Sequence, residues 1–184
     1  MGKYFLIGAP HCGKSTLGRR VADLLSLPFF DTDDMAQENI GETRISNAFN
    51  SYAHIRFRRE QQNAVLKLAE FDGSAIVATG AEVALIPGCV EFMQDIGVII
   101  HVKRKLESIL EELKNSIDYR PILVEVNNGA ILDFRERTVL SYVDELSHYE
   151  VAADFTVDNN ESENHGVELL SALIQAIVKA NGDN

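Results

Sequence analysis

The chain has 184 residues, of which 46% are hydrophobic and 24% are charged, and this size and composition indicate one folded domain rather than two domains or a disordered chain. Its 17 basic and 28 acidic side chains give a formal net charge of -11, which excludes long-range attraction to nucleic acid or to an anionic membrane surface. An anionic ligand must therefore be bound by a local positive site.

The cysteines and histidines form no recognisable metal or disulfide pattern. Cys12 and Cys89 are far apart and belong to no CxxC motif, and the histidines share no HxxxH or HxH spacing. The first apolar run, residues 4–7, is too short for a signal peptide or a membrane span. We therefore expect a cytoplasmic protein without a targeting segment, whose histidines lie on the surface or are hydrogen-bonded in the core.

Short apolar runs alternate with helical patterns along the chain. The runs are mostly β-branched or aromatic and predict buried strands at residues 4–7, 28–30, 75–78, 98–102 and 155–157. Apolar residues at helical spacing predict core-facing helices, with stripes over 17–25, 106–113 and 170–178. Because crossover helices must bury these stripes, the pattern indicates an α/β sandwich in which helices cover both faces of a parallel sheet.

Ligands of such sheets gather at the carboxyl ends of the strands, so the residues that follow the strands are the candidates for function. Two segments depart from the alternation. Residues 33 to about 71 are helical in pattern, broken at Gly41, and form an insertion beside this edge. Residues 115 to about 130 have no period and are longer than a usual connection, which favours a flap over the site, with a plain surface loop as the alternative.

The stretch GAPHCGKST matches the phosphate-binding pattern G-x-x-x-x-G-K-[ST], with a strand before it and a helix after it. Gly8 and Gly13 are its glycines, and the backbone N–H groups of the loop would cradle a phosphate. Lys14 would reach the β- and γ-phosphates, and Ser15 would bind Mg²⁺. With Thr16 beside them, these residues predict a site for MgATP.

The segment FFDTDD follows the second predicted strand and contributes carboxylates to the same edge. Asp31 and Asp33 are two apart, so an extended segment would point both to one face, where one could serve Mg²⁺ and the other an acceptor hydroxyl. Asp34 and Gln37 have the spacing of a helix capping box. We therefore assign Asp34 to capping and keep the other two carboxylates for chemistry.

Together these residues resemble the shikimate kinase family, small relatives of the nucleoside monophosphate kinases. The matching motifs follow the family order over most of the chain, and they are GAPHCGKSTLGR at 8–19, PFFDTDD at 28–34, FRR at 57–59, AIVATG at 75–80, RPIL at 120–123 and HYEVAADFTVD at 148–158. The resemblance implies a single domain over residues 1–184 with a five-stranded parallel sheet, a substrate-binding helical insertion at about 33–71 and a lid at about 115–130. It also implies transfer of the ATP γ-phosphate to the 3-hydroxyl of shikimate.

The resemblance also implies roles for individual residues. Asp31 would organise Mg²⁺ through water, and Asp33 would bind the acceptor hydroxyl. Arg58 would bind the shikimate carboxylate, Gly80 would offer its backbone to the substrate, and Arg120 in the lid would neutralise the transferring phosphate.

The sequence departs from the family pattern mainly on the acceptor side. Three consecutive glycines after the third strand are replaced by Gly80, Ala81 and Glu82. The family has an arginine four residues before the tyrosine that Tyr149 matches, whereas this chain has Glu145, so a cation has become an anion. Further replacements are Gln61 for a glutamate, Leu113 for the first lid arginine and His11 for a phosphate-loop glycine.

The sequence leaves three functions open. The first is a shikimate kinase of aromatic amino-acid biosynthesis, and the second is a kinase of the same architecture acting on a different polyol or hydroxy compound. The third is an ATP-binding regulatory module with a decayed acceptor site, which the retention of Asp33 and Arg120 argues against. The expected ligands are MgATP and a small molecule, and the sequence leaves the oligomeric state undetermined, with a monomer compatible.

Overall fold

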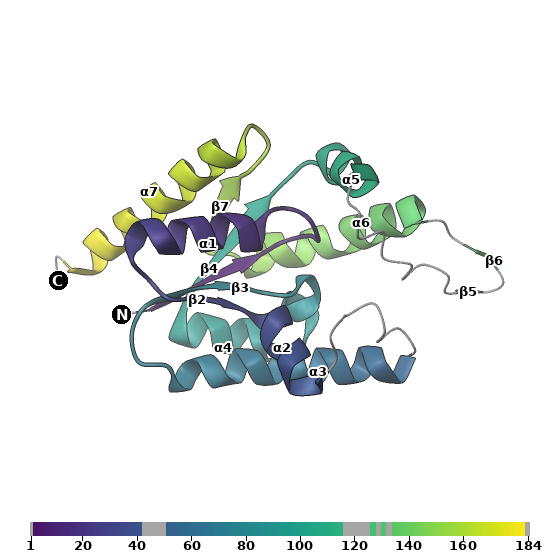
Figure 1. Ribbon diagram of the computed structural model, residues 1–184, viewed down its shortest axis with the longest axis horizontal. Helices are drawn as coiled ribbons and strands as arrows, with labels where there is room; N and C mark the ends of the chain where they lie inside the picture. Colours follow the sequence, from purple (N-terminus) through teal and green to yellow (C-terminus); the bar gives the residue numbers. More distant parts are fainter. Residues whose placement is uncertain (1, 42–50, 116–125, 128–129, 132–133, 183–184) are drawn as a thin grey trace.

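A five-stranded parallel sheet forms the centre of the computed structural model, which describes residues 2–41, 51–115, 126–127, 130–131 and 134–182 (Figure 1). The strand order is β2-β3-β1-β4-β7. The bounds of these strands are Lys3–Ile7 for β1, Phe29–Asp31 for β2, Ala75–Ala78 for β3, Gly97–Lys103 for β4 and Phe155–Asp158 for β7. Each strand begins and ends within one residue of its expected bounds, so the predicted strands and the α/β sandwich are confirmed.

The burial of a strand follows from its place in the sheet. The central strands β1 and β3 are buried along their whole length, and their side chains, with those of β4, form the core. The edge strand β7 is different, because only Val157 of its four residues is buried. The other edge strand, β2, is only partly buried along its length. The expectation that all strands are buried is therefore wrong at both edges of the sheet.

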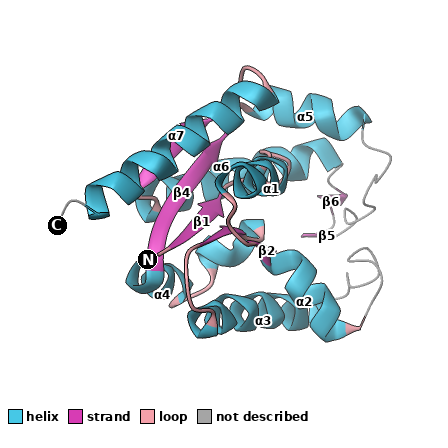
Figure 2. Ribbon diagram, turned by 60° about the vertical axis from the view of Figure 1, so that its left-hand side comes forward, coloured by secondary structure: helices cyan, strands magenta, loops and turns pink. Residues whose placement is uncertain are grey.

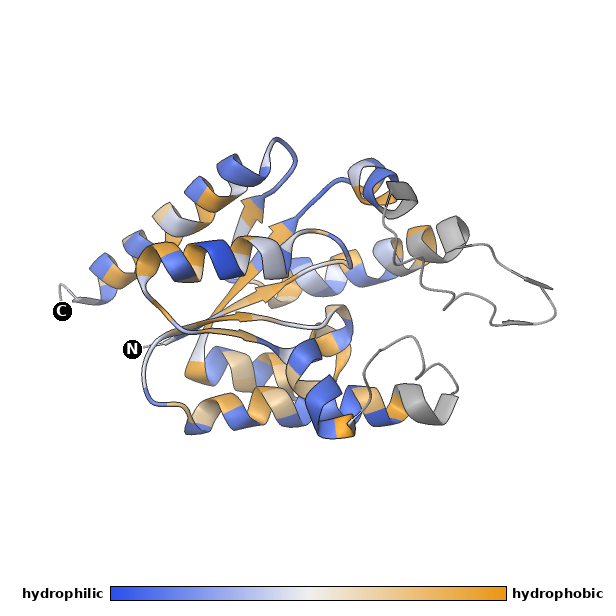
Figure 3. Cartoon of the chain, viewed as in Figure 1, coloured by the Kyte–Doolittle hydropathy of each residue, from blue (hydrophilic) through white to orange (hydrophobic). Residues whose placement is uncertain are grey.

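Helices cover both faces of the sheet, as Figures 1 and 2 show. Helix α1 (Lys14–Leu25) and helix α7 (Glu163–Gly182) pack against each other on one face. Helices α4 (Cys89–Ile96) and α6 (Phe134–Ala152) contact β4 from the other face, and α5 (Leu106–Asn115) packs on α6. The predicted apolar stripes lie in α1, α5 and α7, and Figure 3 shows the apolar residues gathered on the sheet and on the helix faces toward it.

The segment between β2 and β3 is helical. It contains α2 (Thr32–Ile40), α3 (Ser51–Lys67) and the 3₁₀ turn η2 (Leu68–Glu70), and α2 packs along α3. Helix α2 ends at Gly41, whose φ of 74° lies in the left-handed region that glycine adopts without strain. A second 3₁₀ turn, η3 (Ala81–Leu85), follows β3 and contacts both α3 and α6.

Most of the segment expected to form a lid lies outside the described residues, and so does Arg120. Its described part is a two-stranded antiparallel ribbon in which β5 (Val126–Asn127) pairs with β6 (Ala130–Ile131). Within the described part of the chain, no helix has both the length and the apolar character needed to cross a bilayer.

The parallel register brings the carboxyl ends of the strands to one edge. Leu6 of β1 and Asp31 of β2 both align with Ala78 of β3, and Ile7 aligns with His101 of β4. The residues that follow these strand ends therefore lie close together although they are far apart in sequence. This edge carries the candidate site.

Candidate active site

The loop between β1 and α1 has a backbone shaped by its glycines. Gly8 and Gly13 have φ angles of 143° and 101°, which side-chain-bearing residues rarely adopt. The turn is closed by a hydrogen bond from Cys12 N–H to the Ala9 carbonyl oxygen, at 3.2 Å. No side chain among the described residues caps α1 at Gly13, so the first N–H groups of this helix stay available to an anion.

The Lys14 side chain folds back onto the carbonyl oxygens of this loop. Its ammonium donates to the carbonyl oxygens of Gly8 at 2.7 Å and Ala9 at 2.9 Å, and its side chain is buried. A buried cation beside uncapped helix N–H groups supplies the local positive site that a chain of net charge -11 needs to bind phosphate.

Two residues that follow other strands brace the phosphate loop. Arg104, after β4, donates to the His11 carbonyl oxygen at 3.1 Å and forms an ion pair with Glu112 of α5. Asn159, after β7, donates to the Cys12 carbonyl oxygen at 2.9 Å. Sequence reasoning missed both residues, although the rule that directs attention to strand ends applies to them equally.

Ser15 and Asp31 form the pair expected at a magnesium site. The Ser15 hydroxyl donates to Asp31 Oδ2 at 2.6 Å, which joins the first turn of α1 to the end of β2. Among the described residues no group of three His, Cys, Asp or Glu side chains could hold a metal, so any metal here has few protein ligands. One hydroxyl and one carboxylate fit Mg²⁺, which keeps several waters and takes its other ligands from phosphate.

The structure corrects the expected cap of the next helix. Helix α2 begins directly at Thr32, and its N-cap is Asp31, whose Oδ1 accepts from the Asp33 N–H at 3.0 Å. The predicted cap at Asp34 is therefore wrong, because no loop separates β2 from α2. The expectation that Asp31 and Asp33 share one face of an extended segment is wrong for the same reason, since Asp33 lies in the helix.

Asp33 instead points to a second cluster, away from the Ser15 pair. Gln61 of α3 donates from Nε2 to Asp33 Oδ1 at 2.6 Å, and its side chain is buried. Gly80 lies against both groups, and a Cβ atom there would overlap Gln61 Nε2 and Asp33 Oδ1. The Gly80 N–H donates to Thr32 Oγ1 at 2.8 Å. The Gln61 Oε1 atom is buried and has no hydrogen-bond partner in the described structure, so the cluster has an unused acceptor beside a carboxylate.

Gln61→Leu is expected to lower kcat about tenfold or more. Leucine cannot donate to Asp33 Oδ1, so the carboxylate loses the hydrogen bond that orients it at 2.6 Å. Thermal unfolding and ATP binding separate this effect from misfolding, because both should stay near their native values when only the orientation of Asp33 is lost. Native kcat in Gln61→Leu would contradict the role of Gln61.

Arg58 lies on the same side of the site and forms an ion pair with a carboxylate of the protein itself. Arg58 Nε is 3.6 Å from Glu82 Oε2, and its Nη2 donates to the Leu85 carbonyl oxygen at 3.5 Å. Both side chains of the ion pair are about one-third exposed, at 37% and 36%. Glu82, which replaces a family glycine, therefore faces the arginine that the resemblance assigns to the acceptor carboxylate.

Glu145 is a buried residue of α6 that is linked to Ala81 of η3 through Tyr149. Its Oε2 lies 2.6 Å from the Tyr149 hydroxyl oxygen, which is also 2.9 Å from the Ala81 carbonyl oxygen. A hydroxyl carries one proton and cannot donate to both acceptors. A protonated Glu145 would satisfy both acceptors, because it would donate to Tyr149 while Tyr149 donates to Ala81. Burial raises the pKa of Glu145, and the nearby Glu82 charge adds to this effect, while the Tyr149 hydrogen bond opposes it.

The raised pKa of Glu145 gives a prediction for stability. Between the ordinary glutamate pKa, near 4.5, and the higher pKa in the folded state, the unfolded chain releases a proton that the folded chain keeps. The unfolding free energy should therefore fall as the pH rises through this window. Glu145→Gln keeps the hydrogen-bond donor without the charge, so its urea-unfolding free energy should lack this decrease. Parallel pH curves for the two proteins would contradict a protonated Glu145.

One histidine departs from the expectation of surface or hydrogen-bonded histidines. His101 of β4 is buried against Tyr149, with ring centroids 5.5 Å apart, and its Nδ1 has no hydrogen-bond partner in the described structure. Burial lowers its pKa to about 4, and the Lys103 charge adds to this effect. His101 is therefore a neutral core residue beneath the phosphate loop.

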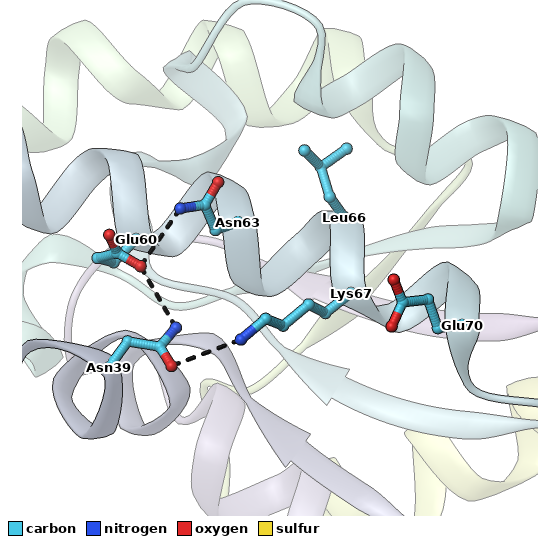
Figure 4. A pocket seen from close by; sticks show the side chains of 6 residues that line it. All are labelled: Asn39, Glu60, Asn63, Leu66, Lys67 and Glu70. Carbon is cyan, nitrogen blue, oxygen red and sulfur yellow. Dashed lines mark hydrogen bonds between the residues drawn. The ribbon is translucent and has the colours of Figure 1, made fainter.

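A separate hollow of about 480 Å³ lies between α2 and α3 (Figure 4). Its walls carry polar side chains that bind one another, since Asn39 and Asn63 both donate to Glu60 at 3.3 Å and Lys67 donates to Asn39 at 3.5 Å. No residue expected in the site lines it.

The structure thus brings the expected residues into two groups at one sheet edge. Gly8, Gly13, Lys14 and Ser15 form a phosphate cradle with Asp31, and Thr16 follows them in the exposed first turn of α1. Asp33 and Gly80 share a hydrogen-bonded cluster, and Arg58 faces Glu82 beside it. A phosphate loop on a parallel sheet, next to a second cluster with a carboxylate, defines the class of P-loop kinases.

Comparisons with known proteins identify the family. The shikimate kinase family model matches residues 10–180. Similar relatives are the shikimate kinases of Paracidovorax citrulli, 31% identical over 94% of this chain and 87% of the relative, and of Caldanaerobacter subterraneus, 28% identical over 99% of each. The shikimate kinase of Acinetobacter baumannii, solved in complex with shikimate, superposes with a TM-score of 0.78 at 22% identity, over 98% of this chain and 94% of the other. The chain belongs to the shikimate kinase family and is an ATP-dependent kinase that phosphorylates a hydroxyl group.

Proposed function

We propose that this protein transfers the γ-phosphate of MgATP to the 3-hydroxyl of shikimate. The observation that carries the proposal is the placement of Asp33, held by Gln61 beside Gly80, at the same sheet edge as the Lys14 phosphate cradle. A module that only binds ATP has no use for this second carboxylate. Membership of the family supports shikimate as the acceptor.

The phosphate loop binds the donor in this proposal. The backbone N–H groups of the loop and of the first turn of α1 donate to the phosphate oxygens, and the Lys14 ammonium moves from the loop carbonyls to the β- and γ-phosphates. Ser15 and Asp31 would hold Mg²⁺, Ser15 directly and Asp31 through water. The metal would neutralise charge on the transferring phosphate.

The second cluster orients the acceptor. Asp33 accepts the hydrogen bond of the attacking hydroxyl, and Gln61 holds the carboxylate in place at 2.6 Å. Gly80 lacks the Cβ atom that would overlap Gln61 Nε2 and Asp33 Oδ1, so it lets these two groups meet. Arg58 receives the substrate carboxylate, for which a planar guanidinium is suited.

The role of Arg120 and the lid at about 115–130 stays a prediction from the resemblance, since Arg120 lies outside the described residues. Closure of this segment would exclude water, which otherwise competes with the acceptor for the phosphate. A cytoplasmic location is also part of the proposal, because both Cys12 and Cys89 are free thiols and the reaction consumes ATP.

A steady-state assay of ADP release tests the proposal. The purified protein is supplied with MgATP and, separately, with shikimate and a panel of other hydroxy acids, sugars and polyols. We expect acceptor-dependent turnover with shikimate at a KM between about 1 μM and 1 mM. Turnover with another acceptor and none with shikimate would replace the proposal by a kinase of different specificity, and tight ATP binding without any stimulation would indicate a regulatory module.

A further inference from the structure

The guanidinium proposed to receive the acceptor carboxylate is already paired with a carboxylate of the protein. Arg58 Nε lies 3.6 Å from Glu82 Oε2. Arg58 comes from α3 and Glu82 from η3, so the pair joins two elements at the acceptor side of the site. An incoming carboxylate and Glu82 therefore compete for the same cation.

The backbone around Glu82 is fixed by hydrogen bonds on both sides. The Gly80 N–H donates to Thr32 Oγ1 at 2.8 Å, and the Val83 N–H donates to the Gly80 carbonyl oxygen at 3.1 Å. The Ala81 carbonyl oxygen accepts from the buried Tyr149 hydroxyl at 2.9 Å. The backbone at Glu82 is thus held by the packing of η3, and the Glu82 side chain lies 3.6 Å from Arg58.

Two carboxylates, Glu82 and Asp33, lie on the acceptor side of the site, and Glu82 is paired with the Arg58 cation. An acceptor carboxylate near Arg58 meets the Glu82 charge at close range, and repulsion between like charges grows as 1/r. Because both groups of the pair are about one-third exposed, water screens part of this repulsion but not all of it.

We infer that Glu82 is a specificity-determining residue that competes with the acceptor carboxylate for Arg58 and so weakens the binding of carboxylate acceptors. The inference rests on the proposed function, because it takes Arg58 as the ligand of the acceptor carboxylate. Glu82 acts on binding and does not touch the reacting hydroxyl, which is bound at Asp33. Its charge should therefore set KM and leave kcat almost unchanged.

The variant Glu82→Gln removes the charge and keeps the size of the side chain. Binding of shikimate and of its methyl ester, which lacks the carboxylate charge, is measured by titration calorimetry without nucleotide, and KM and kcat are measured with MgATP. Glu168→Gln is the matched control, because Glu168 is an exposed residue of α7 and undergoes the same charge change away from the site.

For Glu82→Gln we expect shikimate to bind about tenfold more tightly and its methyl ester to bind with unchanged affinity. KM for shikimate should fall by the same factor, with kcat within about twofold of the native value. If shikimate binds to Glu82→Gln and not to the native protein, the result supports the inference and contradicts shikimate as the acceptor of the native protein.

Two results would overturn the inference. If native protein and Glu82→Gln bind and phosphorylate shikimate equally well, the proposed function stands and Glu82 has no part in specificity. If the variant gains the same affinity for shikimate and for the methyl ester, the Glu82 charge does not compete with the carboxylate. Failure of both proteins to bind or turn over shikimate contradicts the proposed function and the inference together.

Discussion

Lys14→Ala is expected to lower kcat at least about a thousandfold with every acceptor. The ammonium is buried in the phosphate loop, 2.7 Å and 2.9 Å from the carbonyl oxygens of Gly8 and Ala9, and no other described cation contacts these carbonyls. Its loss removes the charge that would follow the γ-phosphate during transfer. ADP release at saturating ATP and acceptor measures the effect.

Lys179→Ala provides the control for Lys14→Ala, since Lys179 is an exposed residue near the end of α7. This variant should keep native turnover. Thermal unfolding of both variants shows whether the loop still folds once the Gly8 and Ala9 carbonyls have lost their donor. Native activity in a folded Lys14→Ala protein would contradict the assignment of the phosphate loop.

Asp33→Asn is the second change with a large expected effect, a decrease in kcat of about a hundredfold to ten-thousandfold. Asparagine keeps the shape of the side chain and can still accept from Gln61, so the cluster around Gly80 should stay assembled. It cannot take up a proton from the acceptor hydroxyl. ATP binding should be unchanged, because the Asp33 side chain accepts from Gln61, whereas Asp31 is the carboxylate that accepts from Ser15.

The adjacent carboxylate offers a sharp comparison for Asp33→Asn. Asp34 is exposed and lies 3.8 Å from Arg19, so Asp34→Asn removes the same charge one residue away without entering the cluster. We expect this variant to keep most of its activity. Equal losses in the two variants would indicate a general electrostatic effect and contradict a specific role for Asp33.

The strands and the phosphate loop could be predicted because they depend on local sequence. Apolar runs such as residues 75–78 are buried where helices cover both faces of the sheet. A loop with glycines at positions 8 and 13 before Lys14 has few ways to connect a strand to a helix. The exposed face of β7 could not be predicted, because exposure depends on the order of strands in the sheet. That order is set by packing between distant segments.

The sequence singled out candidate residues for the acceptor side without indicating their contacts. Asp33 was identified, but its expected extended conformation was wrong, since β2 passes directly into α2 and Asp31 becomes the cap. Its partner Gln61 is 28 residues away in sequence, so only the fold reveals their contact.

The contacts of the two carboxylates that depart from the family pattern could not be predicted from the sequence either. Glu82 and Glu145 stood out as anions where the family has a glycine and an arginine, and no sequence pattern could give their directions. The fold turns Glu82 toward Arg58 and buries Glu145 against Tyr149. Both contacts join elements that only tertiary packing brings together.

The central claim is that this chain phosphorylates shikimate at its 3-hydroxyl. The most direct measurement follows the γ-phosphate itself, with ³²P-labelled ATP and shikimate as the only acceptor, and locates the phosphate in the product by NMR. We expect the label to appear on the shikimate 3-oxygen with native protein and to be almost absent with Asp33→Asn. Release of the label as inorganic phosphate only, with shikimate unmodified, would contradict the account.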